Sequence, residues 1–110
     1  MIRVDCYINI YKDHFCFLDP LKTQLLQEII QCGSLNKAAK KLNISYQNAW
    51  QTIEDMNQSA PSPLVTKQRG GLHGGGMELT TYGQKILKDY TVIENQVKKV
   101  ISQINVEINL

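Results

Sequence analysis

The amino-terminal stretch alternates apolar and polar side chains. The apolar positions recur with period two from Ile2 to Ile10, and several of them are β-branched. Such alternation is typical of a strand with one buried face. A turn at residues 12–14 and a short return strand over Phe15–Leu18 would complete a hairpin. We therefore predict an amino-terminal β-hairpin over residues 2–18.

The rest of the chain carries the apolar stripes of amphipathic helices, each after a residue suited to cap a helix. Apolar side chains repeat at intervals of three and four residues, which predicts one buried helical face. Ser, Thr and Asp are preferred at the N-cap because their side chains accept a hydrogen bond from a free backbone N–H. The predicted helices are 20–32 after Asp19, 35–42 after Ser34, 46–57 after Ser45 and 81–105 after Thr80.

A glycine-rich loop separates two short stretches with strand character. Leu64–Gln68 and Glu78–Leu79 flank this loop, which begins at Arg69. Two strands placed between helices in this way predict a small antiparallel pair within a mainly α fold of small β content (α+β). We predict one domain over residues 1–79, in which this pair and its loop, which we call the wing, cover residues 64–79. Residues 80–110 are predicted to form a long dimerisation helix and a tail.

The last predicted helix carries an apolar seam. Its members are separated by four, three, four, three and four residues, which is the a/d pattern of paired helices. At about 1.5 Å per residue, this helix would extend beyond a domain of under ~80 residues. We expect it to pair with a second copy, the alternative being a helix packed on its own domain. The predicted dimerisation residues are Ile86, Tyr90, Ile93, Val97, Val100 and Ile104.

Residues 35–57 have the pattern of two short helices joined by a tight turn, as in a helix-turn-helix. Uncharged polar side chains fall on the outer face of the second helix. Amides can bond adenine edges in the major groove, and hydroxyls can reach phosphate. Trp50 is expected to pack in the core or at the base of the wing. For Tyr46 two alternatives stand, contact with phosphate and partial burial. The predicted residues of the recognition helix are Ser45, Tyr46, Gln47, Asn48, Gln51 and Thr52.

Positive charge gathers in two segments without carboxylates. The net charge is +2, but residues 34–53 and 64–76 together hold +5, so the remaining residues sum to −3. Clustered cations suit a surface that faces phosphate. The alternative is that these five charges are clustered by chance. We predict that the cations of both segments form one positive face. The predicted DNA-backbone contacts are Ser34, Lys37, Lys40, Lys41, Lys67, Arg69, Gly70, Gly71, Gly74 and Gly75.

The sequence shows no pattern of a metal, cofactor or catalytic site. Cys6, Cys16 and Cys32 include no CxxC pair, and neither His14 nor His73 has the spacing of a ligand. The glycine-rich loop lacks both the GK[ST] of a P-loop and the GxGxxG of a dinucleotide fold. Because no run of 18 apolar residues and no signal peptide is found, we expect a cytoplasmic protein with no membrane partner. Since the two histidines have no assigned nucleophile and the carboxylates are scattered, we expect that it is not an enzyme.

The helix-turn-helix and the glycine-rich loop resemble a known family. Residues 33–57 contain SYxxAW, and residues 70–84 contain GGxxGGGxxLT. Together they are similar to the amino-terminal domain of ModE, the molybdate-responsive regulator, over about residues 19–92, and more distantly to LysR-type regulators. The resemblance implies a dimeric winged helix-turn-helix. In it, the helix after Ser45 enters the major groove and the glycine loop is the wing tip.

Full-length members of that family carry a carboxy-terminal molybdate-binding region, whereas this chain stops after the long helix. We therefore carry over DNA binding and dimerisation, but no molybdate residue and no cofactor. The leading hypothesis is a transcription regulator that binds operator sites in double-stranded DNA as a homodimer, with molybdate-related genes as candidate targets. The second is a winged-helix adaptor that uses the same surface to bind a separate effector-sensing protein.

Overall fold

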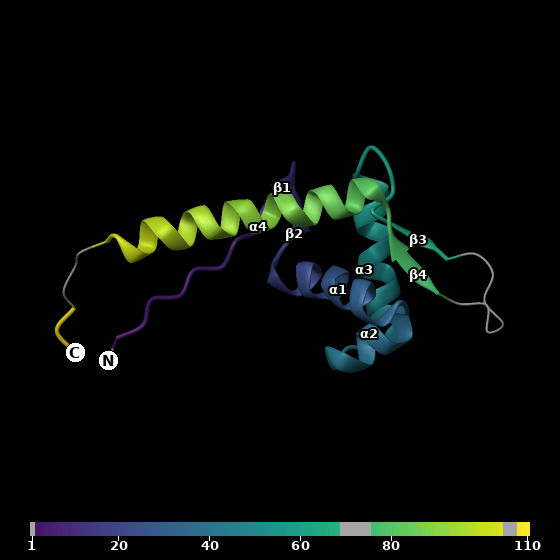
Figure 1. Ribbon diagram of the computed structural model, residues 1–110, viewed down its shortest axis with the longest axis horizontal. Coiled ribbons are helices and arrows are strands. Elements are labelled where there is room, and N and C mark those ends of the chain that lie inside the picture. Colours follow the sequence, from purple (N-terminus) through teal and green to yellow (C-terminus); the bar gives the residue numbers. More distant parts are fainter. Residues whose placement is uncertain (1, 69–75, 105–107) are drawn as a thin grey trace.

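The computed structural model describes residues 2–68, 76–104 and 108–110. Within these ranges the elements follow in the order β1, β2, α1, α2, α3, β3, β4 and α4, and the strands form two antiparallel pairs. The molecule measures 58 × 29 × 22 Å, and α4 lies along its longest dimension (Figure 1). Helices α1, α2 and α3 gather beneath the first half of α4. The predicted α+β class, mainly helical, is confirmed.

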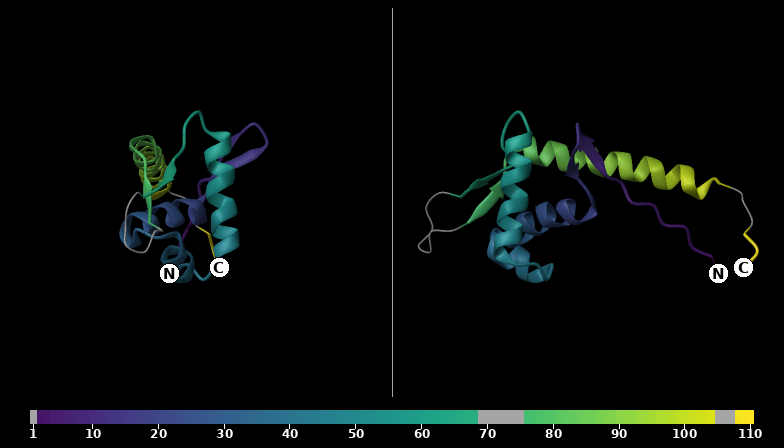
Figure 2. Two further views of the ribbon diagram at one scale, coloured as in Figure 1. Left: turned by 90° about the vertical axis from the view of Figure 1, so that its right-hand side faces the viewer. Right: turned by 180° about the vertical axis from the view of Figure 1, so that it is seen from behind.

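The amino-terminal hairpin is shorter than predicted. Strand β1 covers Ile10–Lys12 and pairs with β2, Phe15–Leu18, through a turn in which Asp13 has a φ of 55°. Residues 2–9 form no strand, which corrects the hairpin predicted over residues 2–18. Because the return strand has only four residues, it offers no partner to the earlier positions. Residues 2–9 run instead beside the second half of α4 (Figures 1 and 2).

The predicted helix caps are confirmed. The Asp19 carboxylate accepts a hydrogen bond from the backbone N–H of Lys22 at 2.8 Å, and the Ser34 and Ser45 hydroxyls accept equivalent bonds. Gly33 follows the first helix with a φ of 64°, a left-handed conformation that glycine adopts without strain. The three helices that result are α1 at Pro20–Cys32, α2 at Leu35–Lys41 and α3 at Tyr46–Ser59.

The core lies where the apolar faces of α1, α2 and α3 meet the base of the wing and the first half of α4. Three alanines in α2 and α3 lie within it, and their small side chains let these helices approach closely. The buried apolar residues are Leu18, Leu25, Leu26, Ile29, Leu35, Ala38, Ala39, Ala49, Ile53, Met56, Leu64, Val65, Leu79, Leu87 and Tyr90.

The wing consists of β3, Val65–Lys67, and β4, Met77–Leu79, in antiparallel register. The Asn57 side chain of α3 fixes where β3 begins. Its amide oxygen accepts from the Leu64 N–H at 2.8 Å, and its amide nitrogen donates to the Val65 carbonyl at 3.0 Å. Since these backbone groups are partly buried, the bonds replace the water that they lose. Helix α3 and the wing therefore have a defined relative position.

Helix α4, Thr81–Ser102, begins directly at the base of the wing. Thr80 caps it, and the Thr80 N–H also donates to the Leu64 carbonyl at 2.9 Å. Gly83 lies against the same carbonyl, because a Cβ at this position would be 2.2 Å from the Leu64 oxygen. The helix can approach β3 this closely only because residue 83 has no side chain. No helix in the described part of the chain is both long enough and apolar enough to cross a membrane.

Candidate nucleic-acid interface

Helices α2 and α3 meet in the arrangement of a helix-turn-helix. Asn43, in the connecting turn, has a φ of 58°, which asparagine tolerates better than most residues. The Ile44 N–H then donates to the Ala39 carbonyl at 3.0 Å and closes the turn. Since Ala49 is buried beneath, the opposite face of α3 is directed outwards.

The exposed face of α3 carries most of the predicted recognition residues. Gln47 and Asn48 lie at its amino-terminal end and are exposed. The Gln51 amide nitrogen donates to the Asp55 carboxylate at 2.8 Å, which leaves the Gln51 carbonyl oxygen to accept. Thr52 is half-buried, and its hydroxyl donates to the Asn48 carbonyl at 2.8 Å. The amides, rather than the Thr52 hydroxyl, are therefore placed to meet a ligand.

Trp50 also lies on this face, and its expected packing in the core or wing base was wrong. Its side chain is 42% exposed, and Tyr46, one turn earlier, is 51% exposed. Both line a shallow hollow together with Gln47, Asn48 and Gln51. The available signal was the four-residue spacing from Tyr46, because positions four apart share one side of a helix.

The wing lies beside the amino-terminal ends of α2 and α3. The Met77 N–H donates to the Gly33 carbonyl at 3.0 Å, which joins β4 to the junction between α1 and α2. As a result, Lys67, Ser34 and Tyr46 line one further hollow. The structure thus brings three of the predicted residues together, Ser34 at the start of α2, Tyr46 of α3 and Lys67 of the wing.

The predicted cations are not equivalent. Lys37, Lys40 and Lys67 are exposed, whereas the Lys41 ammonium pairs with the Glu28 carboxylate at 3.0 Å. The hydrogen bond and the charge of Glu28 raise the pKa of Lys41. This ion pair offsets part of the positive charge predicted at the end of α2. Arg69, Gly70, Gly71, His73, Gly74 and Gly75 lie outside the described residues.

The predicted seam of α4 divides into two halves. Tyr90 is 2% exposed and its hydroxyl donates to the Ile8 carbonyl at 2.9 Å, and Ile86 packs on the core. The prediction that Tyr90 faces a partner is therefore wrong, because the core and the amino-terminal segment cover its side chain, whereas Ile86 is only partly buried. Burial raises the pKa of Tyr90, and the charge of Glu94 adds to the effect. Ile104 lies beyond the end of α4 at Ser102, short of the predicted end at residue 105.

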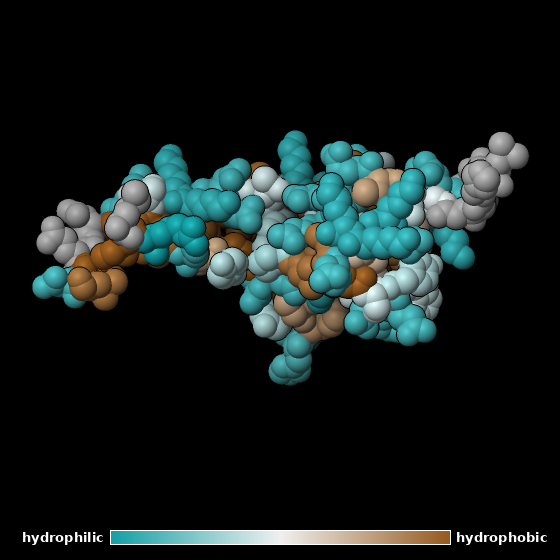
Figure 3. All heavy atoms as spheres, turned by 90° about the horizontal axis from the view of Figure 1, so that it is seen from below, coloured by the Kyte–Doolittle hydropathy of each residue, from teal (hydrophilic) through white to brown (hydrophobic). Residues whose placement is uncertain are grey.

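The second half of the seam is open. Ile93 is 40% exposed and Val100 is 59% exposed. With Val97, Ile101 and Cys6 they line an apolar hollow. Figure 3 shows hydrophobic side chains gathered over the far part of α4 and the adjoining amino-terminal segment. The open part of the seam is thus wider than the helix alone, because residues 2–9 contribute to it.

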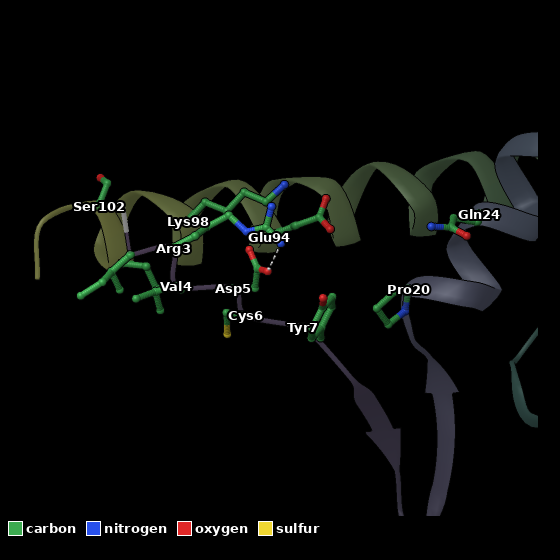
Figure 4. Close-up of a pocket in the computed structure, with 12 residues that line it drawn as sticks. Arg3, Val4, Asp5, Cys6, Tyr7, Pro20, Gln24, Glu94, Lys98 and Ser102 are labelled. Carbon is green, nitrogen blue, oxygen red and sulfur yellow. Dashed lines mark ion pairs between the residues drawn. The ribbon is translucent and has the colours of Figure 1, made fainter. Parts of the chain in front are cut away.

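A cavity of about 810 Å³ lies between the same amino-terminal segment and α4. Arg3 and Asp5 form an ion pair at 3.0 Å in it, facing Glu94 and Lys98 of α4 (Figure 4). These charges are of mixed sign and exposed to water, so they suit a solvated surface. Within the described residues, no group of three or more His, Cys, Asp or Glu side chains could hold a metal ion, and all three cysteines are free.

The fold and this face define a winged helix-turn-helix protein of the class of DNA-binding transcription regulators. Residues 22–84 match the family described as bacterial regulatory helix-turn-helix protein, lysR family. The chain belongs to this family. The predicted resemblance to ModE regulators is confirmed by the curated relatives.

One relative is the transcriptional regulator ModE of Haemophilus influenzae, 42% identical over 94 residues, which are 86% of this chain and 37% of that protein. Another is the DNA-binding transcriptional dual regulator ModE of Escherichia coli K12, 42% identical over 77 residues, or 70% of this chain and 29% of that protein. The chain thus spans about a third of the length of these relatives.

Solved structures agree on the fold. A complex of the CbnR DNA-binding domain with DNA has a TM-score of 0.58 at 18% identity, over 74% of this chain and 88% of that one. A complex of MepR from S. aureus with DNA also has a TM-score of 0.58 at 18% identity, over 80% of this chain and 66% of that one. At these identities the likeness establishes the winged-helix architecture alone.

Proposed function

We propose that this regulator binds operator sites in double-stranded DNA through α3. The observation that carries the proposal is the outward face of α3, where Gln47, Asn48 and Gln51 are exposed beside the wing residue Lys67. The helix enters the major groove, where amides pair with base edges, and the wing contacts the backbone. Ser34, Lys37 and Lys40 contact flanking phosphates. Such a regulator acts in the cytoplasm, where the bacterial chromosome lies.

The binding unit is a homodimer. The open half of the α4 seam and the adjoining amino-terminal segment leave several large apolar side chains in water, and a second copy would bury them. Each fully buried aliphatic side chain contributes about 1.5–3 kcal/mol. Two-fold symmetry places two α3 helices on one side of the dimer, so the operator is an inverted repeat with half-sites about one helical turn, or a multiple of it, apart.

The regulated genes belong to molybdate uptake or use. Relatives at 37–42% identity carry the names transcriptional regulator ModE and molybdenum-pterin-binding protein MopB, the latter from Rhodobacter capsulatus. The SYxxAW stretch of α3 supports the same assignment. Recovery and sequencing of the genomic DNA bound to the protein tests both parts of this proposal. Enrichment of inverted repeats upstream of such genes is expected, and random fragments would contradict it.

Salt dependence separates DNA binding from the adaptor alternative. Release of counterions from several phosphates makes the logarithm of the association constant fall steeply with the logarithm of salt concentration. An acidic protein partner, unlike DNA, carries no condensed layer of counterions. If the chain is an adaptor that binds such a partner, we expect a shallower slope. A slope near zero on operator DNA would contradict the proposal.

Gln47→Ala is expected to weaken binding by about 1–3 kcal/mol at its base pair and to relax the preference there. The reason is the loss of an amide placed to bond a base edge. Competition titrations with operators altered at single positions measure this. Gln58→Ala, at the far end of the same helix, serves as the matched control. Unchanged preference in the Gln47 variant would mean that this amide does not read bases.

Lys67→Ala is expected to weaken binding to all DNA sequences alike and to lower the salt slope by about one unit, because one phosphate contact is lost. Lys88→Ala removes the same charge from an exposed position of α4 and should leave the slope unchanged. Fluorescence anisotropy between low and physiological salt gives both slopes. Equal slopes for the two variants would remove Lys67 from the interface.

A further inference from the structure

We propose that Trp50 recognises thymine, by packing its indole ring on the C5-methyl group of that base in the major groove. The proposal rests on the function proposed above, because it assigns a role within the same interface. Trp50 is 42% exposed on α3, while Ala49, its neighbour in sequence, is fully buried.

The surroundings of Trp50 indicate contact with DNA bases. Trp50 shares its hollow with Gln47, Asn48 and Gln51, so the ring lies among the amides that face outwards from α3. Tryptophan is enriched at the centres of binding surfaces, where a large rigid ring gains most from losing water. In the unbound protein the exposed indole of Trp50 stays in contact with water. A ligand bound to this face of α3 would remove that water and so stabilise the complex.

The chemistry of the major groove selects the base. Base edges there present hydrogen-bond donors and acceptors, and the thymine methyl group is the one apolar feature among them. Glutamine and asparagine suit adenine, whose partner is thymine. An amide and an indole side by side on α3 can therefore read the two bases of one A·T pair, or of two adjacent pairs.

Tyr46, the other exposed aromatic residue of this face, has a different position. It also lines the hollow formed with Ser34 and Lys67, where a phosphate is expected. Trp50 does not line that hollow and lies one turn further along α3. The arrangement assigns Tyr46 to the DNA backbone and Trp50 to the bases.

The test uses uracil, which differs from thymine at this edge only by the missing methyl group. An operator is first obtained by selection from random DNA, and each thymine is then replaced singly by uracil. We expect one position in each half-site at which wild-type protein binds about fourfold more weakly, the effect of one lost apolar carbon. Uracil outside the half-sites is the DNA control.

Two variants assign the effect to Trp50. Trp50→Phe retains an apolar ring and should keep the difference between thymine and uracil, whereas Trp50→Gln should bind both operators equally. Tyr11→Gln, which changes an aromatic residue 60% exposed on β1, should behave as wild type. Circular dichroism spectra show whether each variant is folded.

The outcomes are distinct. If wild-type protein binds its operator but no uracil position weakens binding, Trp50 does not read thymine, and the proposed function stands. The same conclusion follows if Trp50→Gln weakens all sequences while the difference between thymine and uracil persists. If no DNA sequence is selected at all, the proposed function itself fails.

Discussion

Val97→Glu combined with Val100→Glu is expected to give a folded monomer whose affinity for operator DNA is about 10²–10⁴-fold lower, because two half-sites can no longer be bound together. Both side chains line the apolar hollow of α4. Neither belongs to the core, so the monomer should keep its fold. Two carboxylates facing a second copy would be desolvated without partners, which a dimer interface does not tolerate. Sedimentation equilibrium measures the mass, and DNA titration the affinity.

The control must carry the same charge, because added carboxylates also repel phosphate. Val92→Glu with Asn95→Glu places two carboxylates on exposed positions of α4 that do not line the hollow. This variant should remain dimeric and lose only the small electrostatic part of its affinity. If wild-type protein is already monomeric at micromolar concentration, or if the Val97 and Val100 variant stays dimeric, α4 does not form the interface.

Local signals predicted most of the fold. Asp19, Ser34, Ser45 and Thr80 all cap helices as expected, because a cap depends on a side chain and a backbone N–H only three residues away. Gly33 likewise ends α1 through its own backbone conformation. Such features need no knowledge of the tertiary structure, so the sequence alone was sufficient.

The errors arose where distant segments decide the outcome. Alternation at residues 2–9 suggested a strand, but strand pairing depends on a partner of sufficient length, and β2 is too short. The heptad spacing of Tyr90 suggested a partner chain, but its hydroxyl donates to Ile8, 82 residues away in sequence. For Trp50, adjacency to Ala49 suggested burial, although the two side chains point to different sides of α3.

The same distinction governs the candidate interface. The amides of α3 could be placed from the helical period, which fixes the face opposite Ala49 and Ile53. The ion pair of Lys41 with Glu28 could not, because it joins the end of α2 to α1. Charge counted along the sequence therefore overestimated the positive field at this position.

Gly83→Ala is expected to destabilise the protein by about 3 kcal/mol, near the upper end of the range for overpacking. Helix propensity alone predicts the opposite sign, since alanine is favoured over glycine by about 1 kcal/mol within a helix. The structure decides between them, because a Cβ at residue 83 would lie 2.2 Å from the Leu64 oxygen and 2.9 Å from the carbonyl carbon. Both are backbone atoms, so neither can rotate away as a flexible side chain could.

Relief of this clash requires α4 to move away from the start of β3, where Thr80 and Asn57 also hold the backbone. The variant should therefore lose DNA affinity together with stability, since the wing would lose its position beside α3. Urea unfolding measures the stability, with Gln84→Ala as the control because that neighbouring residue is exposed and probes helix propensity alone. A Gly83→Ala protein as stable as wild type would show that α4 does not approach the wing this closely.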